Sequence, residues 1–187
     1  ALPWLPLWVL INNPGMNSEK KLSEAFIALG SNLENPILQI QKAFEELAHI
    51  PETQLTKQSS LYQSAPVGRL NQPDFVNAVI GIRTHLTPHG LFDELMAIEQ
   101  IHGRVRESVN APRTLDLDLL LYDALTFQDK QLTIPHPRMF QRAFVLIPLQ
   151  EIAPDCFIPG HGPISQLVTT CIEQKIQRIP LENSFFH

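Results

Sequence analysis

The pattern of apolar and polar positions along this chain predicts a succession of strands and helices. Residues 24–30 form a short apolar run that ends in a Gly-Ser-Asn turn, which predicts a buried strand. Residues 53–62 mix β-branched and polar side chains, and residues 75–84 alternate with a period of two, so each segment predicts a further strand. In the second segment, one face carries Val76, Ala78, Ile80 and Ile82, and the other carries Phe75, Asn77 and Val79.

Two segments repeat apolar residues at helical spacing, and each begins with a capping residue followed by proline. The first helix is expected from Pro36 after the cap Asn35, and the second from Pro88 to His102 after the cap Thr87. Their inward positions are Ile37, Ile40, Phe44 and Leu47 in the first helix, and Leu91, Leu95, Ile98 and Ile101 in the second.

Residues 115–122 give the clearest strand pattern of the chain. Leu115, Leu117, Leu119 and Leu121 are expected on one face, which leaves Asp116 and Asp118 together on the other, about 7 Å apart at strand spacing. Residues 132–134 are expected to pair with this strand, and the chain from residue 141 onward to be mostly helical. Residues 103–112 show no periodicity and predict a mobile loop.

The order strand, helix, strand, strand, helix, strand is that of a ferredoxin-like α+β sandwich, in which helices cover one face of an antiparallel sheet. At 187 residues the chain predicts a single domain. We expect this domain to cover residues 24–187 and residues 1–23 to be a leader or a disordered extension. The first fifteen residues are apolar and uncharged, but they lack the basic start of a secretory signal and the length of a membrane span.

The charge and the cysteine content limit which partners and which cellular compartment we expect. The net charge of −5 provides no general basic surface, so we expect no nucleic-acid partner. Basic residues do gather locally, at Arg104, Arg106, Arg113, Lys130, Arg138 and Arg142, which suits a small polyanion. Cys156 and Cys171 show neither disulfide nor zinc spacing, so we expect a protein of the reducing cytoplasm. We expect no membrane partner and a monomer.

The Asp116 and Asp118 pair has two interpretations. Both carboxylates could simply face water on a half-buried strand, or they could hold a divalent cation that recruits phosphate. Arg113 precedes the pair by only three residues, and arginine matches phosphate oxygens well, so the neighbourhood favours the second interpretation. His136, fixed between two prolines, is either structural or a donor to a phosphate.

Seven stretches over roughly residues 24–170 form an ordered set of motifs: AFIALGSNLENP, SSLYQSAPVG, NQPDFVNAVI, IEQIHGRVR, APRTLDLDLLLYD, LTIPHPRM and RAFVLIPLQEIAPD. In sequence, order and spacing, this set resembles the 6-hydroxymethyl-7,8-dihydropterin pyrophosphokinases of folate biosynthesis. The resemblance implies pyrophosphoryl transfer from ATP to a reduced pterin, with AMP as the other product.

The resemblance also implies roles for individual residues. Asp116 and Asp118 would hold two Mg²⁺ ions, Arg104 and Arg113 would be catalytic, and Glu99, Arg106, Arg113, His136 and Arg142 would contact ATP. The pterin would be bound by Ser64, Ala65, Val67, Phe75, Asn77 and Phe144, with the two phenylalanines stacked on its ring. From the residues alone, Phe75 and Phe144 could equally be ordinary core residues.

The chain departs from the common family pattern at a few positions. Its loop at 103–113 is about one residue shorter, with Val109 and Asn110 where many relatives carry a basic residue and a tryptophan, and Phe75 replaces a frequent tyrosine.

Two other functions remain open on the sequence alone. A ferredoxin-like RNA-binding module would need exposed aromatic and basic residues on its sheet, whereas this chain has aspartates there. A regulatory domain could bind the same small molecules without turnover. Release of AMP in the presence of ATP, pterin and magnesium would distinguish an enzyme from both.

Overall fold

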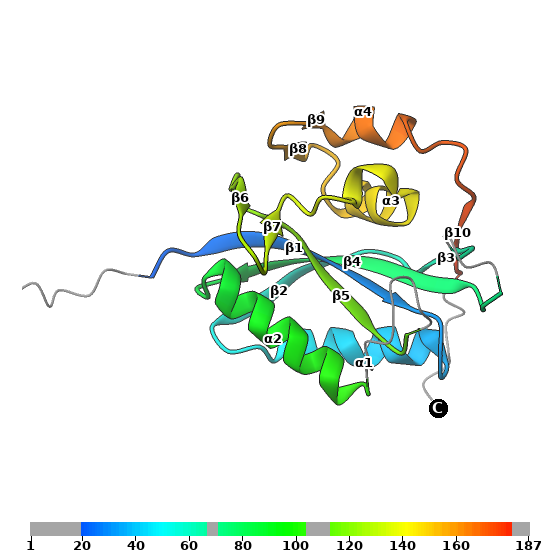
Figure 1. The fold of residues 1–187 in the computed structure, drawn as a ribbon, viewed down its shortest axis with the longest axis horizontal. Helices are drawn as coiled ribbons and strands as arrows, with labels where there is room; N and C mark the ends of the chain where they lie inside the picture. The colour runs from blue at the N-terminus through cyan, green and yellow to red at the C-terminus, as the bar shows by residue number, and fades with distance from the viewer. Residues whose placement is uncertain (1–19, 67–70, 104–112, 181–187) are drawn as a thin grey trace, which may run out of the picture.

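The computed structural model describes residues 20–66, 71–103 and 113–180. A mostly antiparallel sheet lies between two helical layers (Figure 1). Helices α1 (Pro36–Ala48) and α2 (Pro88–Ile101) cover one face, as the sequence predicts. Helix α3 (Ala143–Ile152) covers the other face, and α4 (Ile164–Thr169) packs on α3. The single-domain α+β architecture is therefore confirmed, with a second helical layer in addition.

The central sheet has the strand order β10-β3-β4-β1-β5, and β2 pairs with β4 as well. Its strands are β1 (Ser23–Ser31), β2 (Thr53–Gln58), β3 (Tyr62–Ser64), β4 (Phe75–Thr84), β5 (Asp116–Tyr122) and β10 (Ile176–Arg178). Strand β1 lies between β4 and β5 and pairs antiparallel with both. It begins at Ser23, one residue inside the expected leader.

Two strand predictions are wrong in detail. The segment 53–62 is not one strand, because the Ser59 hydroxyl accepts the hydrogen bond of Val79 N at 2.9 Å and so replaces a backbone partner between β2 and β3. Residues 132–134 do not pair with β5. Instead β7 (Thr133–Ile134) forms a hairpin with β6 (Phe127–Gln128), and two further short strands, β8 (Phe157–Ile158) and β9 (Gly162–Pro163), form another.

A β-bulge in β5 corrects the predicted face of Leu121. Phe26 pairs with Leu121 and Ile27 with Leu119, so Leu120 is an extra residue in the ladder. The bulge shifts the alternation by one position. Leu121 therefore packs beneath α3, on the face opposite Leu117 and Leu119.

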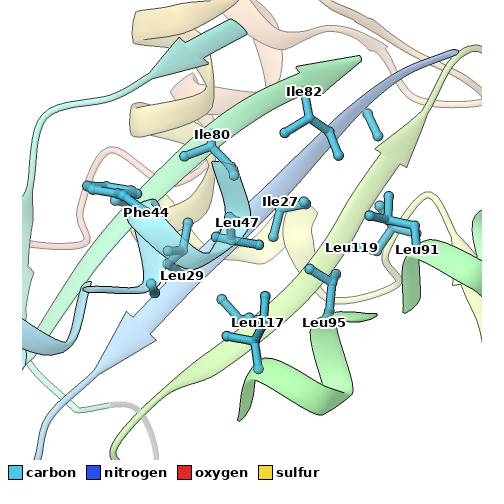
Figure 2. Packing of buried hydrophobic residues seen from close by; sticks show 14 of the residues in the cluster. Ile27, Leu29, Phe44, Leu47, Ile80, Ile82, Leu91, Leu95, Leu117 and Leu119 are labelled. Carbon is cyan, nitrogen blue, oxygen red and sulfur yellow. The ribbon is translucent and has the colours of Figure 1, made fainter. Parts of the chain in front are cut away.

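Each face of the sheet has its own hydrophobic core. Figure 2 shows the first core, in which Ile27, Ile80 and Leu117 from the sheet meet side chains of α1 and α2. Leu47 and Leu95 are the main helical contributions, and both are fully buried. Burial of each such side chain contributes about 1.5–3 kcal/mol relative to exposure. The second core joins Val79 and Leu121 to Leu146 of α3, so both helical layers are fixed to the same strands.

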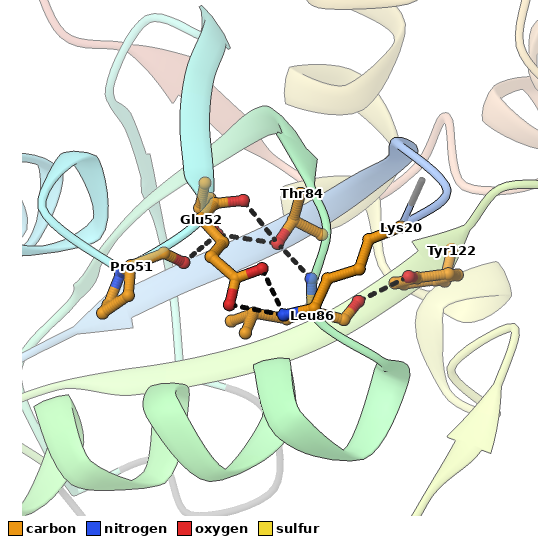
Figure 3. Close-up of polar contacts among 7 residues, drawn as sticks. Lys20, Pro51, Glu52, Thr84, Leu86 and Tyr122 are labelled. Carbon is orange, nitrogen blue, oxygen red and sulfur yellow. Dashed lines mark hydrogen bonds and ion pairs between the residues drawn. The ribbon is translucent and has the colours of Figure 1, made fainter. Parts of the chain in front are cut away.

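A closed polar network ties the strands together at one end of the sheet (Figure 3). The buried Thr84 hydroxyl lies 2.7 Å from that of Thr53 and accepts a hydrogen bond from Leu86 N at 3.1 Å. Tyr122 donates its hydroxyl proton to Leu86 O at 2.6 Å, and Lys20 forms an ion pair with Glu52. These polar groups are therefore satisfied by contacts with one another.

No helix in the described part of the chain has the length and apolar character needed to cross a membrane.

Candidate functional site

A pocket of about 630 Å³ lies at the other end of the central strands, which is a usual size for a small-molecule site. Its floor is formed by β1, β4 and β5, and its walls by the N-terminal end of α3 and by β10. The pocket is lined by Ala28, Leu29, Gly30, Ser64, Ala65, Pro66, Gln72, Phe75, Asn77, Arg113, Asp116, Asp118, Arg138, Gln141, Arg142, Ala143, Phe144, Val145, Gln174, Lys175 and Ile176.

The sheet register sets the floor of the pocket. Gly30 pairs with Asn77 on one side and with Asp116 on the other, and residues paired in an antiparallel sheet point to the same face. Ala28 lies opposite Asp118 in the same way. Because the central strand carries glycine and alanine here, the floor stays open between an acidic side on β5 and an amide side on β4.

Basic side chains face both aspartates. Arg113 forms an ion pair with Asp116, while Arg142 Nη1 and His136 Nε2 each lie 3.7 Å from a carboxylate oxygen of Asp118. All of these side chains are at least half buried. The two like charges on β5 are therefore held beside three basic groups that come from different segments of the chain.

The position of His136 follows from the bulge in β5. Its backbone N–H donates to Leu120 O at 2.9 Å, which fixes the Pro-His-Pro turn to the strand. Arg138 N donates to Nδ1 of the ring at 3.3 Å, so the neutral ring carries its proton on Nε2, on the side of Asp118. Burial lowers the pKa of His136, and Arg142 and Arg138 lower it further, while Asp118 acts in the opposite direction. The pKa of the ring therefore lies below its ordinary value of 6.5, which favours the neutral form.

Burial also lowers the pKa of Arg142, with the attraction of Asp118 opposing it. An arginine keeps its charge at physiological pH in spite of such a shift. The Arg142 guanidinium also lies 5.4 Å from the ring centre of Phe144, so one arginine contacts both the acidic side and the aromatic wall.

The amide side of the pocket is built from neutral groups. Asn77 is 3% exposed, and its Nδ2 donates to Ser64 Oγ at 2.9 Å. Phe75 is the first residue of β4, and the register of β3 against β4 pairs it with Ser64. Phe75 and Phe144 are both half buried and both line the pocket, so neither is a fully buried core residue.

Only one of the four remaining predicted site residues is described by the structure. Glu99 of α2 is buried, and its Oε1 accepts a hydrogen bond from Leu117 N at 2.7 Å, so it supports the edge of β5 behind the aspartates. Neither Glu99 nor His136 is among the described residues that line the pocket. Arg104, Arg106 and Val67 lie outside the described residues.

Sequence reasoning missed several residues of the pocket. Gln72 lies within the stretch NQPDFVNAVI, so its place in a family motif was the available signal. Gln174 and Lys175 come from the end of the chain just before a three-residue strand, which is too short to show a period. Gln174 accepts from Ala143 N at 3.0 Å and thereby caps α3 at the pocket wall.

The two aspartates suit magnesium bound together with phosphate. No group of three or more His, Cys, Asp or Glu side chains suited to a metal occurs among the residues that the structure describes. Magnesium, however, keeps several waters and is commonly bound through one or two carboxylates plus substrate phosphates. Asp116 and Asp118 supply this donor set, and Arg113 and Arg142 supply donors for phosphate oxygens beside it.

Comparison with solved structures defines the class of fold first. The chain resembles Plasmodium falciparum HPPK-DHPS with pterin and p-hydroxybenzoate, with a TM-score of 0.63 over 83% of this chain at 14% sequence identity. It spans less than half of that longer chain, of which 45% is covered. The fold is therefore that of an HPPK domain.

Comparison of sequences then identifies the family. The model of the 7,8-dihydro-6-hydroxymethylpterin-pyrophosphokinase (HPPK) family matches residues 26–154, and this chain belongs to that family. The 2-amino-4-hydroxy-6-hydroxymethyldihydropteridine pyrophosphokinase of Haemophilus influenzae is 45% identical over 155 residues, which cover 83% of this chain and 97% of that protein. The protein of the same name from Pseudomonas aeruginosa is 43% identical over 159 residues, with 85% and 98% covered.

Proposed function

We propose that this protein transfers the pyrophosphoryl group of ATP to the hydroxymethyl group of 6-hydroxymethyl-7,8-dihydropterin, a step of folate biosynthesis that yields AMP and the pterin diphosphate. Family membership supports this activity. The observation that carries it is the division of the pocket: Asp116, Asp118 and two arginines stand on one side, and Phe75 and Asn77 on the other.

The neutral side of the pocket would bind the pterin. A flat heterocycle needs apolar faces to stack on and a few fixed polar partners at its edge. Phe75 and Phe144 would provide the faces. Asn77, held by its hydrogen bond to Ser64, would provide a rigid amide for the ring edge, together with Ala65 and, outside the described residues, Val67.

The charged side of the pocket would bind the nucleotide. Arg113 and Arg142 offer guanidinium groups that match phosphate oxygens, and neutral His136 offers an Nε2–H donor. Arg104 and Arg106 would add to this set from outside the described residues. Glu99 is expected to act at the nucleotide side through its hydrogen bond to β5.

Asp116 and Asp118 would hold two Mg²⁺ ions, which would offset the charge of the phosphates when bound. Without a bound cation, the two carboxylates would repel a triphosphate. The acidic pair would therefore hold the metal ions, and the arginines would bind the phosphate oxygens. Arg113 is already oriented by Asp116, so little reorganisation is needed when the nucleotide arrives.

In the reaction, the pterin hydroxyl oxygen forms a bond to the β-phosphorus while the bond between that phosphorus and the oxygen of AMP breaks. The hydroxyl proton passes to solvent, so that AMP, the pterin diphosphate and one proton are the products. Phosphoryl transfer of this kind depends on positioning and on stabilisation of charge. Arg113 would stabilise charge on the transferring group, and the aromatic walls would hold the hydroxymethyl group in line and exclude water.

We also propose that the enzyme is a cytoplasmic monomer that uses neither a nucleic-acid nor a membrane partner. The net charge of −5 supports the absence of a nucleic-acid partner, since it provides no general basic surface. The pyrophosphokinase domain would begin with β1 at Ser23 rather than at residue 24, and the residues before it would be a leader or a disordered extension.

Formation of AMP from ATP, Mg²⁺ and 6-hydroxymethyl-7,8-dihydropterin tests the proposal. AMP should form only when all three are present, and Asp116→Asn should abolish it. Asp123→Asn is the matched control, because Asp123 follows the same strand but forms an ion pair with Lys21 outside the pocket. ATP consumption that does not depend on pterin, or full activity of Asp116→Asn, would contradict the proposal.

A further inference from the structure

Asn32 is a buried residue that joins the two sides of the pocket from outside it. It directly follows β1 and is 2% exposed. Its Nδ2 donates to Gln72 Oε1 at 3.0 Å and to Pro73 O at 3.2 Å, and its Oδ1 accepts from Arg113 N at 2.9 Å. Its backbone N–H also donates to Arg113 O at 3.1 Å. One side chain thus contacts segments that are 40 and 81 residues away in the sequence.

The partners of Asn32 allow only one orientation of its amide. Pro73 O can only accept a hydrogen bond, and Arg113 N–H can only donate one, so Nδ2 must face Pro73 and Oδ1 must face Arg113. A carboxylate could satisfy Arg113 but not Pro73, and a hydroxyl is too short to reach both. The site therefore requires an amide.

The two contacted segments lead to opposite sides of the pocket, the charged side and the neutral side. Arg113 brings its guanidinium to Asp116 on the charged side. Gln72 lines the pocket itself, and Pro73 lies two residues before Phe75, the aromatic residue at the start of β4. A shift of either segment would change the distance between the charged side and the neutral side of the pocket.

We propose that Asn32 is a positioning residue, whose amide sets the placement of Arg113 relative to the Gln72–Phe75 wall. This inference rests on the proposed function and deepens it. Among the described residues that line the pocket, the Asn32 side chain contacts the side chain of Gln72 alone. Its other two hydrogen bonds hold backbone atoms of Pro73 and Arg113. Reacting groups must be aligned closely for transfer, and a displacement of about 1 Å can lower a rate about 100-fold.

Asn32→Asp separates the two arms of this contact. The aspartate keeps an acceptor for Arg113 N, but it loses both donated hydrogen bonds and places an oxygen beside Pro73 O and Gln72 Oε1. We expect kcat/KM for the pterin to fall about 10-fold to 100-fold. Affinity for a nonhydrolysable ATP analogue should change no more than about threefold, because the Arg113 arm remains. Asn32→Ala, which removes both arms, should weaken nucleotide binding as well.

Asn35→Ala is the matched control for a purely structural effect. Asn35 lies three residues further on, is exposed, and caps α1 through Leu38 N at 3.4 Å without contacting the pocket. It should lower the unfolding midpoint while leaving kcat and both KM values unchanged. If Asn32→Asp behaves like this control, or loses activity only in proportion to its folded fraction, the positioning role is wrong.

Hydrogen exchange gives a readout that does not depend on turnover. In Asn32→Asp, exchange should rise at residues 71–75 more than at Arg113 and Thr114, and Asn32→Ala should raise it at both. If the unaltered protein forms no AMP, the proposed function fails, while the exchange data still decide whether Asn32 couples the two segments. Unchanged exchange at both segments in Asn32→Ala would overturn the inference.

Discussion

The two ends of strands β1, β4 and β5 both carry buried polar side chains, but they use them differently. At the closed end, Thr84 and Tyr122 bind Thr53 and the backbone of Leu86 (Figure 3). At the pocket end, Asn77 and Asp116 line a cavity of about 630 Å³. The same strands therefore end in a closed hydrogen-bonded network on one side of the sheet and in a pocket on the other.

The difference shows which features mark a site. Burial of a polar group is not sufficient, since Thr84 is fully buried in the closed network. At the pocket end, two like charges lie on adjacent positions of one strand face, with cations supplied by separate segments. Such an arrangement favours an additional charged ligand. Substitutions at the pocket end should therefore change activity, and those at the closed end should change stability.

Arg113→Ala should have the largest effect. Loss of a fixed cation beside the transferring group is expected to lower kcat by about 100-fold to 1000-fold. The unfolding midpoint should change little. Steady-state AMP formation measures the loss, with Arg178→Ala as the control because Arg178 lies on β10 and faces Glu151. Normal turnover of Arg113→Ala would remove this residue from the mechanism.

Phe75→Ala tests the neutral wall of the pocket. Removing one aromatic face should raise the KM for the pterin about 10-fold to 100-fold, in line with about 1.5–3 kcal/mol for a buried phenylalanine. The KM for ATP should stay nearly constant. Phe157→Ala is the control, since Phe157 is 68% exposed on β8. An equal rise in both KM values would argue against a separate pterin side.

Thr84→Val tests the closed end. Valine keeps the shape of threonine but leaves Leu86 N without its acceptor, so the free energy of unfolding should fall by about 1–3 kcal/mol. Activity of the folded protein should be unchanged. Urea unfolding and AMP formation on the same sample give both values. A large fall in kcat without loss of stability would break the distinction between the two ends.

Glu151→Gln should give the smallest effect, one that depends on pH. Partial burial alone would raise the pKa of Glu151, but hydrogen bonds from Ser60 and Tyr62 outweigh it and hold the pKa below its ordinary value of 4.5. The carboxylate therefore stabilises the fold above pH 4.5, and this contribution is lost as the pH falls through the lowered pKa. The difference in urea midpoint between the two proteins should shrink on acidification. A constant difference would contradict this assignment.

Much of the fold could be predicted because local patterns determine it. The caps at Asn35 and Thr87 mark the true starts of α1 and α2, and alternation in residues 75–84 gives the correct faces of β4. The bulge at Leu120 could not be predicted, because it depends on the register with β1. The pairing of β10 with β3 joins distant segments through only three residues.

Parts of the site could also be predicted, again where a local sequence pattern determines them. Alternation alone places Asp116 and Asp118 on one face, whereas the aromatic walls came only from the family resemblance. Asn32 could not be singled out, because its importance lies in hydrogen bonds to two distant segments. Glu99 was expected at the nucleotide side, and its contact with the backbone of β5 is visible only in three dimensions.

The central claim is that the pocket end directs attack at the β-phosphorus of ATP, and phosphorus NMR of the reaction products tests it most directly. With ATP, Mg²⁺ and 6-hydroxymethyl-7,8-dihydropterin, the spectrum should show AMP and a pterin diphosphate in equal amounts. ADP together with a pterin monophosphate, or an unchanged ATP spectrum, would contradict the account.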